Sequence, residues 1–118
     1  MTVRRVRQVF ISARDFDGQC RFYEQILGLS LQFRDGDNWA QFSAGDISLA
    51  VAAGDETMGA APGSWVPVFE VEDMEATLNA VESAGGSHGS IRDMGEHGRT
   101  VLAADAAGCQ FAMLAKRQ

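Results

Sequence analysis

The feature that most constrains the fold of this chain is an internal repeat. A shift of 58 positions places the segment that begins at Ala13 on the segment that begins at Val71, and Asp15 then falls on Asp73. In each copy an aspartate able to cap a helix precedes apolar residues at the spacing of one helix face. A glycine closes each copy, in "LGL" and in "AGG". The chain therefore contains two related modules, each with one amphipathic helix.

Strand-like runs surround both predicted helices. One run precedes each helix and three follow it, separated by turn signals such as "RDGDN", so each module reads β-α-β-β-β. We expect one α+β domain over residues 1–118, with module one at about 1–53, a linker at about 54–64 and module two at about 65–118. One helix covers only one face of such a sheet. Two modules are therefore expected to form a curved eight-stranded sheet around a cleft, with the helices outside.

Composition and charge exclude several classes of function. The net charge of −6 argues against nucleic-acid binding, since phosphate contacts need basic patches, and Arg4, Arg5 and Arg7 are interpreted as a solvated edge. The acidic balance serves solubility or favours a cationic ligand. No membrane span or signal peptide is predicted, so we expect a cytoplasmic protein. Cys20 and Cys109 lack the spacing of a zinc site and are interpreted as reduced thiols.

The segments "FISARDFDGQCRFYEQILGL" and "VLAADAAGCQFAMLAK", together with the repeat, resemble the vicinal oxygen chelate superfamily. This superfamily includes glyoxalase I, the extradiol dioxygenases and the bleomycin resistance proteins. The resemblance covers essentially the whole chain, although the usual Asp-Pro-Asp-Gly turn is "DAAG" here. In the enzymes of the superfamily the cleft holds a divalent metal on four positions, which come from the first and last strands of each half.

The resemblance places those four metal positions on Gln8, Ala50, Val66 and Ala112. The repeat offset links Gln8 with Val66, which is a check internal to this sequence. Only Gln8 has an atom that can donate to a metal. Shifting the alignment by one residue replaces the alanines by apolar side chains of the opposite sheet face. The resemblance therefore implies a cleft with no metal and no other cofactor.

Alternation along the strands predicts which other side chains face the cleft. Phe10 and Glu70 share the face of the four positions, whereas Val51 and Met113 lie on the other face and are expected beneath the helices. Glu70 is interpreted as a partner for a ligand amine, as a base or as an exposed strand-end carboxylate.

Aromatic residues and histidines supply the remaining candidates. Phe33 and Trp39 could stack a planar ligand, although Trp39 equally suits the junction between modules or a dimer interface. His88 and His97 lie in a glycine-rich segment; His97 either contacts ligand, with Arg99 as an anion partner, or both histidines are surface residues. Ser, His and Asp residues occur, but no constellation for nucleophilic catalysis is identified.

Three functions are compatible with this pattern. The first is a metal-free small-molecule binding protein, similar to the bleomycin resistance type, that sequesters a planar apolar or cationic compound as a homodimer. The second is a metal-dependent lyase or dioxygenase with an atypical shell of Gln8, Glu70 and a loop histidine. The third is a non-catalytic subunit or interaction module. No catalytic residue is assigned, and the predicted ligand-binding residues are Gln8, Phe10, Phe33, Trp39, Ala50, Val66, Glu70, His97 and Ala112.

Overall fold

The computed structural model describes residues 3–116 and contains nine strands and two α-helices, which confirms the α+β class. The chain divides into two compact units. The N-terminal unit is Gln8–Val66, and the C-terminal unit joins Met1–Arg7 to Pro67–Gln118. Strand β1 (Val3–Ser12) crosses the boundary, so its first residues belong with the C-terminal half of the sequence.

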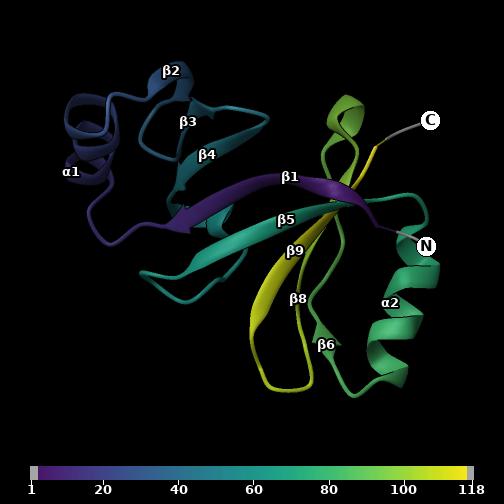
Figure 1. Ribbon diagram of the computed structural model, residues 1–118. Coiled ribbons are helices and arrows are strands. Elements are labelled where there is room, and N and C mark those ends of the chain that lie inside the picture. Colours follow the sequence, from purple (N-terminus) through teal and green to yellow (C-terminus); the bar gives the residue numbers. More distant parts are fainter. Residues whose placement is uncertain (1–2, 117–118) are drawn as a thin grey trace. The chain divides into compact units, whose positions relative to one another are not determined.

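The N-terminal unit has the expected β-α-β-β-β order (Figure 1). Its strands lie in the order β2-β3-β4-β1, with β4 parallel to β1 and antiparallel to β3. The elements after β1 are α1 (Phe16–Arg21), the π-helix η1 (Phe22–Ile26), β2 (Ser30–Asp35), β3 (Trp39–Ala44) and β4 (Ile47–Ala52).

Helix α1 covers one face of these strands through a small apolar core. Cys20 packs with Phe42 and Val51, and the position of Val51 beneath the helix agrees with the strand alternation. The Asp15 side chain accepts a hydrogen bond from the backbone N of Gly18 at 3.2 Å, which caps the helix as its sequence predicts. Burial raises the pKa of the Cys20 thiol, so this cysteine behaves as a core residue.

The end of this helix differs from the expectation. The spacing of apolar residues places Leu27 on the buried face, but this residue is 56% exposed. The backbone N of Leu27 donates to the carbonyl of Phe22, five residues earlier, because the last turn is a π-turn. The wider turn rotates the helix face, and Leu29 packs against the core instead.

The segment expected to be a linker is held against β1. It contains the short helix η2 (Gly54–Thr57), and the hydroxyl of Ser12 donates to the carbonyl of Ala60 at 3.1 Å. Backbone hydrogen bonds also join Ser12 to Gly63 and Ser64. These contacts explain why the segment belongs to the N-terminal unit.

In the C-terminal unit the strands lie in the order β1-β5-β9-β8-β6, and β5 is parallel to β9. The elements are β5 (Trp65–Val71), α2 (Met74–Ser83), β6 (Ser87–His88), β7 (Arg92–Asp93), η3 (Gly95–His97), β8 (Arg99–Ala104) and β9 (Gln110–Ala115). Strand β5 begins before Pro67, in the N-terminal unit.

The second half departs from the expected strand count, since one predicted strand is split into β6 and β7. Both pieces pair with β8, with His88 opposite Ala103 and Arg92 opposite Thr100. Three residues on the β6–β7 side therefore face two on β8, and such an extra residue interrupts regular pairing. The result is nine strands where eight were expected.

Helix α2 packs on its own strands through Met74 and Leu78, which contact Val101 and Met113. This arrangement confirms that Met113 lies beneath a helix. The side chain of Asp73 caps α2 by accepting from the backbone N of Ala76 at 3.0 Å. Within residues 3–116, neither helix combines the length and the apolar character that a bilayer crossing requires.

Candidate functional site

One face of the N-terminal unit, opposite α1, carries most of the predicted ligand-binding residues. The strand registers set Phe33 opposite Gln41, Gln41 opposite Ala50, and Ala50 opposite Phe10. Paired residues in a sheet project to the same side. We call this side of the N-terminal unit the glutamine face, after the polar side chains at its centre.

Gln8 and Gln41 anchor a chain of hydrogen bonds across the glutamine face. The Nε2 of Gln8 donates to the Oγ of Ser48 at 2.9 Å and to the Oε1 of Gln41 at 3.1 Å. The same Gln41 oxygen accepts from the indole Nε1 of Trp39 at 3.2 Å, and Gln41 Nε2 donates to Gln32 at 2.9 Å. The network fixes the orientation of the Trp39 ring. The predicted ligand-binding residues did not include Gln32, Gln41 or Ser48, although alternation places Ser48 on the same face as Ala50 and Gln41 on the same face as Trp39.

The aromatic residues of this face differ in accessibility. Phe33 is 50% exposed, and Trp39 is half-buried with its ring centroid 6.3 Å from that of Phe10. Phe10 and Ala50 are themselves buried. Phe33 and Trp39 therefore supply the accessible aromatic surface, and Phe10 with Ala50 forms its packed base.

The residues of the glutamine face do not fit a divalent metal. The parallel register sets Gln8 opposite Ser48, so the possible metal ligands nearest the Gln8 amide are the Ser48 hydroxyl and the Gln41 amide. Divalent metals in proteins are held chiefly by carboxylates, imidazoles and thiolates. Across residues 3–116, no group of three His, Cys, Asp or Glu side chains is arranged to hold a metal ion.

In the C-terminal unit, Glu70 lies at the centre of a cationic cluster. Its Oε1 accepts from Arg7 Nη1 at 3.2 Å and from Arg5 Nε at 3.4 Å, and Lys116 Nζ lies 3.9 Å away. The Glu70 side chain is 8% exposed, whereas those of Arg5, Arg7 and Lys116 are 51%, 37% and 59% exposed. The carboxylate is thus buried beneath three cations that still reach solvent.

This environment revises the expected role of Glu70. Burial by itself raises the pKa of Glu70, but the three cations together hold that pKa below its ordinary value. The carboxylate is therefore ionised at neutral pH and already paired within the chain. A ligand amine or a divalent cation at this carboxylate would meet three positive side chains.

The other predicted site residues make none of the polar contacts described above. Val66 and Ala112 are fully buried, and Ala112 pairs with Val68 as Ala50 pairs with Phe10. His97 is exposed in η3.

His88 has a local structural role. Its ring nitrogens lie 2.7 Å from the carbonyl of Gly89 and 2.6 Å from a carboxylate oxygen of Glu82. These two acceptors raise the pKa of His88, the Gly89 carbonyl most strongly.

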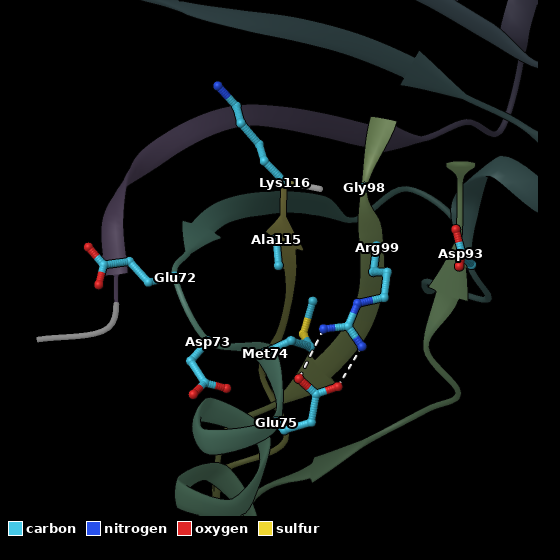
Figure 2. A pocket seen from close by; sticks show the side chains of 9 residues that line it. All are labelled: Glu72, Asp73, Met74, Glu75, Asp93, Gly98, Arg99, Ala115 and Lys116. Carbon is cyan, nitrogen blue, oxygen red and sulfur yellow. Dashed lines mark hydrogen bonds and ion pairs between the residues drawn. The ribbon is translucent and has the colours of Figure 1, made fainter. Parts of the chain in front are cut away.

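A cavity of about 440 Å³ opens beside the start of α2 (Figure 2). Arg99 crosses it to pair with Glu75, while the Lys116 side chain extends away from that pair. Glu72 and Asp93 add negative charge to its wall, and Asp73 is occupied as the helix cap. The cavity is polar, and the side chains that pair across it stabilise the fold.

Comparison with known proteins agrees with this architecture. Residues 8–114 match the family model described as a glyoxalase-like domain. The chain belongs to this glyoxalase-like family. The match confirms the resemblance to the vicinal oxygen chelate superfamily. A relative described as an uncharacterized protein of Mycolicibacterium smegmatis is 33% identical to this glyoxalase-like chain over 87 residues, which are 74% of the chain and 72% of the relative.

Solved structures show the same fold at low sequence identity. Methylmalonyl-CoA epimerase from Mycobacterium tuberculosis superimposes with a TM-score of 0.71 at 18% identity, covering 99% of the glyoxalase-like chain and 91% of the epimerase. A glyoxalase/bleomycin resistance protein/dioxygenase superfamily member from Vibrio splendidus superimposes with a TM-score of 0.69 at 12% identity. The match covers 96% of the glyoxalase-like chain and 98% of that protein. A methylmalonyl-CoA epimerase in complex with methylmalonyl-CoA and NH4+ superimposes with a TM-score of 0.71 at 14% identity. The match covers 98% of the glyoxalase-like chain and 96% of that epimerase.

Proposed function

We propose that this glyoxalase-like protein binds a small, planar, mostly apolar molecule without a metal ion. The observation that carries the proposal is the state of Gln8, whose amide is bonded to Gln41 and Ser48 where metal-binding members of the superfamily need a ligand. Ala50, Val66 and Ala112, at the other three positions, offer no donor. A cytoplasmic location and a role in sequestering the ligand are parts of the same proposal.

The glutamine face supports a planar ligand. Half-exposed Phe33 and the oriented ring of Trp39 offer apolar surface, and the amides of Gln8 and Gln41 lie beside them. Binding sites commonly combine aromatic walls with a few fixed polar groups. The N-terminal unit has three basic and eight acidic residues, a balance that favours neutral or cationic compounds over anions.

A metal-dependent lyase or dioxygenase is the alternative function. It needs Gln8, Glu70 and a loop histidine as ligands. Glu70 is surrounded by three cations, and His88 is bonded to Glu82 and Gly89. Elemental analysis after dialysis tests this alternative: about one Zn, Ni, Mn or Fe per chain, lost in Gln8→Ala, would overturn the metal-free proposal.

Tryptophan fluorescence tests the binding proposal. The chain has two tryptophans, so Trp65→Phe leaves Trp39 as the only reporter. This variant is titrated with neutral and cationic planar aromatics such as phenazines. Adding Phe33→Ala is expected to weaken binding about twofold to tenfold, since one stacked aromatic contributes roughly 0.5–1.5 kcal/mol.

Phe22→Ala is the matched control. Phe22 is 48% exposed, close to the 50% of Phe33, but it lies in η1 on the helical side of the unit. Equal losses in Phe22→Ala and Phe33→Ala, or a titration of the Trp39 signal that Phe33→Ala leaves unchanged, would rule out the glutamine face as the site.

A further inference from the structure

The cationic cluster around Glu70 has a charge that its own carboxylate does not balance. Arg5, Arg7 and Lys116 supply three positive charges and Glu70 supplies one negative charge. The neighbouring Glu72 pairs with Arg4 at 3.4 Å, which leaves the cluster with an excess of two positive charges. This excess stands out in a chain whose net charge is −6.

The geometry leaves hydrogen-bond donors of the cluster unused by Glu70. The contacts of all three cations converge on the single oxygen Oε1, and neither arginine binds the carboxylate with two nitrogens. A guanidinium carries five N–H groups, so Arg5 and Arg7 keep further donors beyond those contacts. Their side chains are 51% and 37% exposed, and these donors are open to a ligand.

The fold holds the three cations on one side of the C-terminal unit. Arg5 and Arg7 are alternate residues of β1 and project to the same face. Lys116 follows directly after β9, two residues beyond Leu114, which pairs with Glu70. The buried carboxylate draws the three side chains together, and this reduces the entropy that an incoming anion has to overcome.

We propose that Arg5, Arg7 and Lys116 form a binding site for a phosphate monoester, with Glu70 as the residue that positions them. A phosphate monoester carries about −1.5 to −2 charges at neutral pH, which matches the excess of two positive charges. Its three oxygens accept charge-assisted hydrogen bonds, and arginine forks suit that geometry better than a single ammonium does. The site goes beyond the glutamine face, because it lies in the other unit and selects the opposite charge.

Calorimetric titration at low ionic strength tests the site with inorganic phosphate and glycerol phosphate. The wild-type protein is expected to bind both saturably, with weaker binding as salt is added. Arg7→Gln is expected to weaken both about tenfold, since a hydrogen bond between charged partners is lost. The control is Arg4→Gln, on the same strand but paired with Glu72, which should bind like the wild type.

Lys116→Gln keeps the test decisive if Arg7→Gln fails to fold, because the Lys116 side chain is 59% exposed and outside the core. It should also weaken phosphate binding. The proposal is overturned if the wild type shows no saturable binding, or if Arg4→Gln weakens it as much as the cluster variants. Tighter binding of succinate than of phosphate would also overturn it, by showing a carboxylate site.

Discussion

Arg99 holds Glu75 with both terminal nitrogens, at 2.5 Å from Nη1 to Oε2 and 2.9 Å from Nη2 to Oε1. The pair joins the first turn of α2 to the first residue of β8. Arg99 is the main reason that the pKa of Glu75 falls to about 2, and a backbone hydrogen bond of Glu75 adds to the effect. The two-nitrogen geometry is the strongest form of arginine–carboxylate contact.

The stability of the protein in acid should therefore depend on this pair. Because the pKa of Glu75 is lowered on folding, its contribution to stability is present above the ordinary glutamate pKa of 4.5 and is lost as the pH falls through about 2. Glu75→Gln is expected to flatten the dependence of the urea midpoint on pH in that window. The double variant with Arg99→Gln should cost little more than either single change; fully additive losses would contradict the pairing.

The contribution of His88 to stability should have the opposite dependence on pH. Its pKa is raised on folding by Gly89 and Glu82, so its contribution to stability is present below the ordinary histidine pKa of 6.5 and is lost as the pH rises through the higher folded pKa. We expect the unfolding midpoint to fall across that range in the wild type and not in His88→Gln. An NMR titration of the imidazole checks the shift directly. His97→Gln serves as the control, and a ring that titrates at or below 6.5 would refute the prediction.

Gly98 occupies a backbone conformation that other residues rarely adopt. Its φ is +93° and its ψ is −156°, and an added Cβ would lie 2.3 Å from the carbonyl oxygen of Ala115. Gly98→Ala is expected to lower the free energy of unfolding by about 2 kcal/mol or more. Gly108→Ala is the matched control, since its φ is +89° but no atom lies within 4 Å. It should cost about 1 kcal/mol from backbone strain alone. Equal costs in urea unfolding would refute the steric argument.

Strand β2 is an exposed edge of the N-terminal unit. All six of its residues are exposed, and they include Leu31 at 43% and Phe33 at 50%. Such edges invite pairing with another chain. We therefore keep the proposal of a homodimer that buries on the order of 1,500 Å². Sedimentation at micromolar concentration should show a dimer that Leu31→Lys weakens. Ile91→Lys is the control: Ile91 is also exposed, at 38%, and its substitution should leave the dimer unchanged. A wild-type monomer would count against it.

Local patterns in the sequence predicted most of the fold. Alternation assigned Val51 and Met113 to the helix-covered faces, and both pack there. Two features of the fold were not predicted because no local pattern in the sequence encodes them. Leu27 follows a π-turn that spacing rules for a regular helix do not anticipate. The interruption between β6 and β7 arises from one extra residue opposite β8, which appears only once the strands are paired.

The candidate sites were harder to predict than the fold. Gln8 was identified through the resemblance to the superfamily, with the repeat as a check, but its partners Gln41 and Ser48 lie 33 and 40 residues away in the chain. Arg5 and Arg7 are 65 and 63 residues from Glu70, and their sequence reads only as a basic strand edge. Side-chain partners at such separations depend on which strands are neighbours, and an alternating pattern does not specify that.

The division of β1 between the two units has a consequence for any attempt to split this protein. Met1–Arg7 belong with Pro67–Gln118, so a cut within residues 54–64 would remove from the C-terminal fragment the strand beside β5, together with Arg5 and Arg7. The missing strand would remain on the other fragment. The repeat in the sequence thus does not define two autonomous pieces, and the halves would have to recombine by fragment complementation to restore either the sheet or its cations.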